Sequence, residues 1–138
     1  MTDFDFDEIE EDLDLVVPDI YRLFIENIDN QDYDLSKHGI YANTETLLKG
    51  NWQMRMRLGD QTPKWENHYL DFGVGDGCGN YFFLLATDEE DDLVQPWAHD
   101  PPGIEDVSTG SEFLQNIFKA VADGFNGPEK FMFQGNAW

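Results

Sequence analysis

The feature that most constrains the fold of this chain is a glycine-rich turn between two apolar segments, in the sequence YLDFGVGDGCGNYFFLLAT (residues 69–87). Apolar residues alternate along 69–74, which is typical of a half-buried strand. Residues 81–87 form a continuous apolar run of strand length, which indicates a central strand. Glycines within 75–80 permit the positive φ angles of a tight turn. The pattern therefore predicts an antiparallel β-hairpin.

Four further segments complete the expected fold. Residues 93–99 read as a third strand, which should lie at an edge or carry a bulge because Pro96 cannot donate to a ladder. Apolar residues at helical spacing predict helices at 18–28 and 111–123. Residues 44–58 fit both helical and strand periodicity, and we favour a helix. We expect an α+β fold, a mostly antiparallel sheet packed by N-terminal and C-terminal helices.

The length of 138 residues predicts a single domain. Residues 1–15 are rich in acids, and we interpret them as a loosely held, solvated arm. The domain itself is then expected to occupy residues 16–138. Its last part, after Phe125, is rich in aromatic residues and is expected to dock on the rest.

The charge of the chain limits its partners. Asp and Glu number 29 against 8 Lys and Arg, a net charge of −21 that repels nucleic acid and anionic membranes and attracts cationic proteins. No apolar run reaches the ~20 residues that span a bilayer. The N-terminus lacks the basic and apolar regions of a secretory signal, and the one cysteine, Cys78, favours a reducing compartment. We expect a cytoplasmic protein.

Catalytic and metal sites lack sequence support. Cys78 could pair with His38, His68 or His99 only if the fold brings them together, and Asp76 would disfavour its thiolate. The histidines and the cysteine lack metal-ligand spacing. The glycine turn leads into a strand, whereas a phosphate-binding glycine loop leads into a helix. We therefore expect no catalytic residue, no metal and no cofactor.

Acidic residues near the strand ends form the candidate partner-binding surface. Charged loops beside an aromatic residue are typical of protein-binding sites. The candidates are Asp76, Asp88, Glu89, Glu90, Asp91, Asp92 and Asp100, with Trp97 as a possible anchor. The alternative is that Trp97 belongs to the core and the acids only keep the protein soluble.

The order of these elements resembles the SUKH superfamily. The resembling segments are VVPDIYRLFIEN (16–27), the hairpin at 69–84, VQPWAHDPP (94–102) and STGSEFLQNIF (108–118). The family includes the yeast cell-wall assembly regulator and many bacterial immunity proteins. The resemblance implies an α+β fold and a non-enzymatic role, and it supplies no catalytic residues. Bacterial members typically neutralise a cognate toxin domain, often a nuclease.

Charge and resemblance together lead to one expected function and one alternative. The expected function is an immunity protein that occludes a cognate toxin with a basic surface, because an acidic protein can compete where nucleases grip phosphate. The alternative is an adaptor or regulatory scaffold of the cell-wall assembly regulator type.

Overall fold

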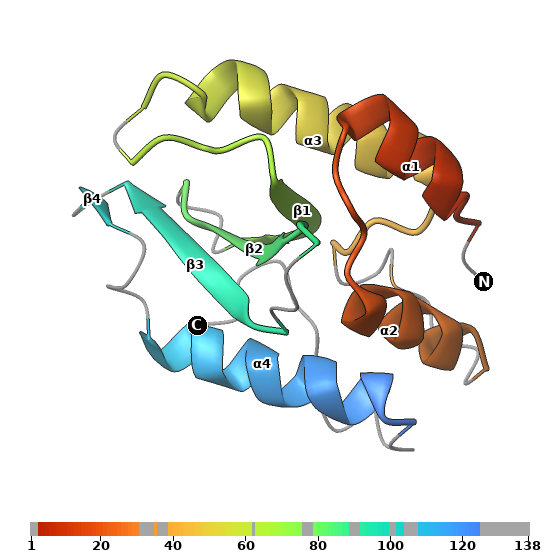
Figure 1. The fold of residues 1–138 in the computed structure, drawn as a ribbon. Coiled ribbons are helices and arrows are strands. Elements are labelled where there is room, and N and C mark those ends of the chain that lie inside the picture. The colour runs from red at the N-terminus through yellow and green to blue at the C-terminus, as the bar shows by residue number, and fades with distance from the viewer. Residues whose placement is uncertain are drawn as a thin grey trace.

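A computed structural model describes residues 3–30, 35, 39–61, 63–75, 79–88, 92–99, 102–103 and 108–124. They form a single small α+β domain, in which three helices precede the strands along the chain and one helix follows them (Figure 1). In chain order the elements are α1 (Phe6–Leu13), α2 (Asp19–Asn30), α3 (Thr44–Leu58), β1 (Tyr69–Gly75), β2 (Tyr81–Leu85), β3 (Val94–His99), β4 (Pro102–Gly103) and α4 (Ser108–Ala122). The expected fold class is confirmed.

The sheet has the order β1-β2-β3-β4, and every neighbouring pair is antiparallel. Leu70 is opposite Leu84 in the β1–β2 pair, and Phe82 is opposite Pro96 in the β2–β3 pair. The hairpin is therefore present, and β2 is central as its continuous apolar run predicts. The turn residues 76–78 lie outside the described residues.

Both faces of the sheet are covered, which differs from the half-buried strand expected at 69–74. Figure 1 shows the sheet between α3 on one side and α4 on the other. Leu70 and Phe72 belong to the larger core with α2 and α4. Tyr69 and Phe83 point the other way and pack with Trp65 and other residues in a second cluster. The alternation in β1 was read correctly, but α3 and Trp65 bury its second face as well.

Helices α2 and α4 pack against each other through stacked aromatic rings. Phe24 of α2 and Phe118 of α4 lie 4.2 Å apart between ring centroids, with an angle of 2° between their planes. Phe118 also meets Phe72 of β1 edge-on at 5.4 Å. Gly124 follows α4 with φ of 83°, so it ends this helix as expected. The helical spacing within 111–123 also predicts that Phe113 is buried, but Phe113 is 42% exposed.

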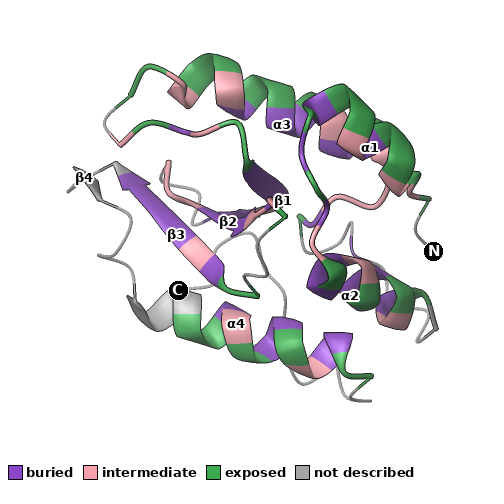
Figure 2. Cartoon of the chain, in the orientation of Figure 1, coloured by how far each residue is buried: buried purple, intermediate pink, exposed green. Residues whose placement is uncertain are grey.

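Helix α3 confirms the helical reading of residues 44–58, with a different buried face. Helical spacing alone places Leu48, Trp52 and Arg55 or Met56 on one face of this helix. The structure instead buries Leu47, Gly50, Asn51 and Met54, and leaves Met56 81% exposed. Figure 2 shows the exposed outer sides of α1 and α3. Asn43, not Thr44, caps α3 by accepting from the Thr46 N–H at 2.8 Å.

The acidic N-terminal segment is part of the fold. Helix α1 begins after Asp5, whose side chain accepts from the Glu8 N–H at 3.1 Å, and Ile9 and Leu13 are fully buried. Glu10 forms an ion pair with Arg22 of α2 at 3.2 Å. The expectation of a loosely held arm is therefore wrong for residues 6–13, because a helix places their apolar side chains on one face.

Strand β3 has a blocked outer edge near Pro96. Among the described residues, β4 pairs only with Ala98 and His99, so Pro96 lies on an edge part of β3 as expected. At the start of the strand, the side-chain oxygen of Gln115 accepts from the Val94 N–H, and its amide donates to the Asp92 carbonyl at 2.7 Å. A proline and a capped N–H leave this edge poorly suited to pair with another strand.

Candidate functional site

The structure describes three of the eight predicted site residues, namely Asp88, Asp92 and Trp97. Asp88 and Asp92 are exposed, whereas Asp76, Glu89, Glu90, Asp91 and Asp100 lie outside the described residues.

Trp97 is not an exposed anchor. Only 1% of its surface is accessible, its indole N–H donates to the Pro63 carbonyl at 3.1 Å, and its ring packs against Trp65. Its place on the β3 face that α3 covers explains this burial. The core interpretation of Trp97 is therefore the correct one.

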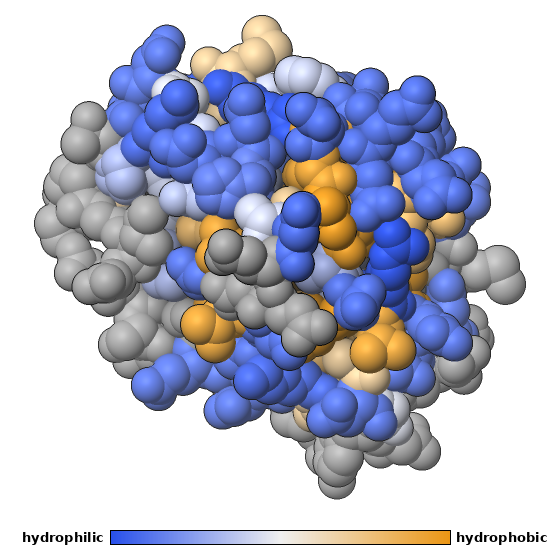
Figure 3. Space-filling model, viewed as in Figure 1, coloured by the Kyte–Doolittle hydropathy of each residue, from blue (hydrophilic) through white to orange (hydrophobic). Residues whose placement is uncertain are grey.

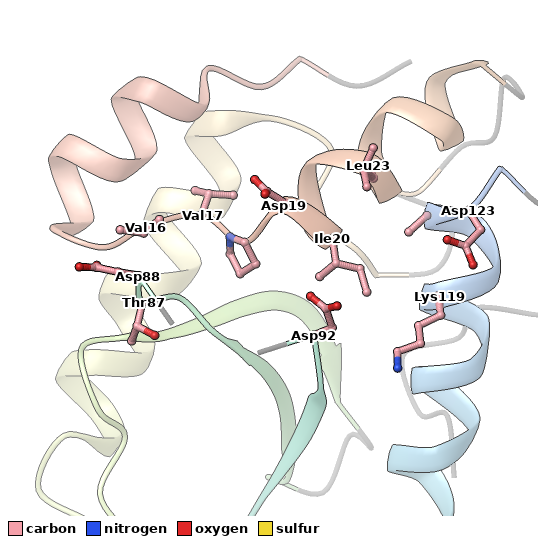
Figure 4. A pocket seen from close by; sticks show the side chains of 12 residues that line it. Val16, Val17, Asp19, Ile20, Leu23, Thr87, Asp88, Asp92, Lys119 and Asp123 are labelled. Carbon is pink, nitrogen blue, oxygen red and sulfur yellow. The ribbon is translucent and has the colours of Figure 1, made fainter. Parts of the chain in front are cut away.

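Asp88 and Asp92 meet other acids around one hollow, which we call the acidic hollow (Figure 4). It has a volume of about 500 Å³ and is formed by three separate parts of the chain. These parts are the start of α2 with the segment before it, the connection between β2 and β3, and the end of α4. The lining residues are Val16, Val17, Pro18, Asp19, Ile20, Leu23, Thr87, Asp88, Asp92, Lys119, Ala122 and Asp123.

Apolar side chains form the floor and part of the rim of the acidic hollow. Val17 and Ile20 are buried, whereas Val16 is 41% and Leu23 is 46% exposed. The Val16 N–H donates to the Ala86 carbonyl at 3.1 Å, which holds the segment before α2 against the end of β2. Figure 3 shows hydrophobic atoms reaching a mainly hydrophilic surface on this side of the molecule. Exposed apolar atoms ringed by charge are typical of an interaction site.

Four carboxylates and one ammonium surround that apolar surface. Asp19, Asp88, Asp92 and Asp123 line the acidic hollow together with Lys119. Within the described part of the chain, no carboxylate oxygen lies at ion-pair distance from the Lys119 ammonium. The helix dipole opposes an acid at the C-terminal end of a helix, so the stability of α4 does not explain Asp123. A bound cationic group would relieve the repulsion among these acids.

Sequence reasoning found only two of the twelve residues that line the acidic hollow, Asp88 and Asp92. In the sequence, the helix dipole explains Asp19. Leu23 belongs to one of two overlapping apolar faces of the same helix, and the sequence does not show which face is buried. The apolar arc of α2 is wider than one buried face, which was the available sign that one apolar side chain would remain exposed. Nothing local marks Asp123 or Lys119, because only the fold brings the end of α4 to the start of α2.

A second polar group lies inside the protein at Asp71 of β1. Asp71 is 3% exposed; one carboxylate oxygen accepts from the Tyr41 hydroxyl at 2.7 Å, and the other accepts from the Gly73 N–H at 2.9 Å. Asn51 of α3 accepts from the Asp71 N–H at 2.8 Å and donates to its carbonyl at 2.9 Å. The buried backbone of Asp71 is thus fully paired.

Burial raises the pKa of Asp71 from 3.8 to about 6, although the hydrogen bonds from Tyr41 and Gly73 act in the opposite direction. Burial and the Asp71 charge together raise the pKa of Tyr41 and of Tyr21. The Tyr21 hydroxyl is buried and has no hydrogen-bond partner among the described residues. Burial of the Asp71 carboxylate and of the unpaired Tyr21 hydroxyl therefore lowers the stability of the fold.

We expect the Asp71→Asn substitution to flatten the dependence of stability on pH. The folded state binds the Asp71 proton more tightly than the unfolded chain, so the stability that this group contributes is lost as the pH rises through about 6. The loss between pH 5 and pH 8 is about 1.4 kcal/mol. Urea unfolding at both pH values measures it. Asp60→Asn, an equal charge change at an exposed site, should keep the wild-type pH dependence.

The described residues contain neither a metal-ligand cluster nor a membrane-spanning helix. They contain no group of three or more His, Cys, Asp or Glu side chains placed to hold a metal ion. Within the same residues, no helix combines the length and the apolar character needed to cross a membrane.

Comparisons with known proteins give no match for this chain. No protein-family model matches the chain, and neither a curated protein nor a solved structure is significantly similar to it. The resemblance to the SUKH superfamily therefore stays a prediction.

Proposed function

We propose that this protein is a bacterial immunity protein that binds a cognate toxin domain with a basic surface and neutralises it by occlusion in the cytoplasm. The observation that carries the proposal is the acidic hollow, where four carboxylates surround exposed Val16 and Leu23. The role that we assign to the protein is non-enzymatic.

Long-range charge supports rapid capture. A net charge of −21 attracts a basic partner from a distance, and such steering raises association rates ~10–10³-fold at low salt. A nuclease needs a basic surface to hold the phosphates of its substrate. An acidic protein bound there blocks the substrate without any chemistry of its own.

Short-range contacts support specificity. Charged rims mainly set the association rate, whereas buried apolar contacts at the centre of an interface mainly set its lifetime. Val16 and Leu23 offer such a centre, since both are partly exposed beside buried Val17 and Ile20. Lys119 adds one positive charge among the acids, so it favours a partner whose basic surface carries an acid at the matching position.

Charge reversal within the acidic hollow tests the proposal. We expect the double substitution Asp88→Lys and Asp92→Lys to slow association with the toxin domain by at least ~10-fold at low salt, and to flatten its salt dependence. The partner is the toxic domain encoded beside the gene of this protein. Stopped-flow fluorescence measures the rates, and protection of cells that express the toxin measures neutralisation.

The matched control is Glu45→Lys with Asp60→Lys on and just after α3, which contributes no residue to the acidic hollow. Both doubles add four positive units and change the net charge from −21 to −17, so they reduce long-range attraction equally. If both doubles slow association to the same degree, the acidic hollow is not the docking site. Binding without neutralisation would favour the adaptor role instead.

A further inference from the structure

A second cavity lies at the other end of the β1–β2 hairpin from the acidic hollow. It holds about 260 Å³ between α3 and the end of β1, and Tyr41, Arg57, Asp71 and Tyr81 are among the residues that line it. At this end of the hairpin Tyr81 is opposite Gly75. At the other end Leu85 is opposite Tyr69, and the chain continues from Leu85 into the acidic hollow. We call it the Asp71 cavity.

Two glycines give the cavity its shape. A Cβ atom at Gly50 of α3 would lie 2.2 Å from the Tyr41 hydroxyl oxygen. A Cβ atom at Gly73 would lie 2.4 Å from the Gly39 carbonyl oxygen, and its φ of 105° is unfavourable for other residues. The missing side chains let Tyr41 approach both α3 and β1, which brings its hydroxyl to Asp71.

The negative charge of Asp71 is not needed for this architecture. An asparagine would accept from the Gly73 N–H through its oxygen and donate to the Tyr41 hydroxyl through its amide. It would avoid the cost of burying a carboxylate. Across the described residues, no Lys, Arg or His nitrogen lies at ion-pair distance from Asp71. A buried carboxylate without a cation, in a cavity, is therefore a candidate ligand group.

We propose that the Asp71 cavity binds the cationic head group of an amine or a guanidinium compound. The Asp71 carboxylate supplies the opposite charge, and both of its oxygens retain lone pairs beyond those used by Tyr41 and Gly73. Tyr41 and Tyr81 also line the cavity, and aromatic rings attract cations through their faces. The cation is either a free small molecule or a lysine or arginine of a bound protein.

Arg57 is the competing cation within the chain. It is exposed on α3 and lines the cavity, so its positive charge opposes the entry of another cation. We therefore expect Arg57→Gln to strengthen binding, since glutamine removes the charge and keeps a polar side chain. This expectation separates a cavity for an external cation from one built for Arg57.

Titration of the full-length protein with methylguanidinium and methylammonium tests the proposal. Amide chemical shifts of Gly73 and Gly75 report occupancy, and the carbon shift of the Asp71 carboxyl reports its charge. We expect saturable binding that Asp71→Asn weakens at least ~10-fold, because a charge-assisted contact is lost while the internal hydrogen bonds are kept. In the wild type, either cation should lower the pH at which Asp71 titrates.

Further variants and ligands complete the experiment. Glu45→Gln, which removes an exposed carboxylate from α3, should leave binding unchanged. A Gly-Arg-Gly peptide that binds more tightly than methylguanidinium supports a cation carried by a protein, and the reverse order supports a free small molecule.

Equal binding by the wild type and Asp71→Asn overturns the proposal. The proposal is also overturned if Asp71 of the Arg57→Gln variant titrates at a higher pH than in the wild type and added cation does not change this pH. That result would mean that the cavity serves Arg57. Neither result bears on the acidic hollow, so the two proposals fail independently.

Discussion

We expect the Gly73→Ala substitution to lower the free energy of unfolding by about 3 kcal/mol or more. Gly73 has φ of 105°, and an added Cβ would lie 2.4 Å from the Gly39 carbonyl oxygen and 3.0 Å from the Tyr41 nitrogen. Backbone strain at such an angle costs about 1–3 kcal/mol, and overpacking costs about the same again. The crowding atoms belong to the backbone, so no side-chain rotation relieves the contact.

The loss should reach beyond the residue itself. The Tyr41 N–H donates to the Phe72 carbonyl at 3.2 Å, and the Gly73 N–H donates to Asp71. Displacing residues 39–41 breaks the first of these bonds and pulls the Tyr41 hydroxyl from Asp71. Urea unfolding measures the loss, and the carboxyl shift of Asp71 reports the local change.

Gly124→Ala is the matched control, because it tests a positive φ without crowding. Gly124 has φ of 83°, and the nearest described atom to its Cβ position, Asn27 Oδ1, is 3.7 Å away. Its cost should be about 1 kcal/mol. If Gly73→Ala costs no more than Gly124→Ala, residues 39–41 do not approach β1 as closely as the structure shows.

Local patterns predicted the elements whose signals do not depend on the rest of the fold. The hairpin combines a glycine turn with two apolar strands, and α4 combines apolar residues at helical spacing with a terminal glycine, Gly124. Pro96 placed its strand at an edge, because proline cannot donate a hydrogen bond. In each case the signals lie within the segment itself and agree with one another.

Segments with two competing signals were harder to assign. In the N-terminal segment, the eight acidic residues from Asp3 to Asp14 suggested a solvated arm, whereas Ile9 and Leu13 at helical spacing are fully buried. The apolar spacing prevails because burial of two large side chains stabilises more than exposed acids at the surface destabilise. Helix α3 was assigned correctly, but its inward face depends on where β1 and α1 lie.

Sites that join distant segments could not be predicted from local patterns. Asp19, Asp92 and Asp123 come together only because α2 packs beside α4 and the β2–β3 connection lies beside both. The alternation along 69–74 places Asp71 on the face of the strand opposite its apolar residues, yet α3 and Tyr41 cover it. Trp97 failed as an anchor for the same reason, since the second face of the sheet is buried too.

We expect the Arg55→Met substitution to destabilise the fold by about 2–4 kcal/mol and to loosen α1. The same guanidinium nitrogen of Arg55 donates to the Leu13 carbonyl at the end of α1 and to the Asn67 carbonyl before β1, both at 2.6 Å. Hydrogen bonds from a charged donor each contribute about 1.5–3 kcal/mol. Methionine has a similar length but no donor, so both carbonyls lose this partner.

Neighbouring contacts join Arg55 to α1 more closely. Its guanidinium lies over the Trp52 ring, 4.9 Å from the centroid, and the Trp52 indole N–H donates to Asp12 of α1 at 2.8 Å. Burial lowers the pKa of Arg55, whereas Asp12 and Asp14 raise it. The Arg55 side chain thus contacts two backbone carbonyls and one aromatic ring, and two acidic residues act on its charge.

Arg57→Met is the matched control, since it removes the same charge two residues along α3 and changes the net charge from −21 to −22 as Arg55→Met does. Arg57 is exposed, so its replacement should change stability by less than about 0.5 kcal/mol. Amide hydrogen exchange should show lost protection in α1 for Arg55→Met alone. Equal stability of the two variants would mean that packing of Ile9 and Leu13 holds α1 without this link. A selective loss in α1 would show that the arginine contacts, and not only those two apolar side chains, bring the acidic segment into the domain.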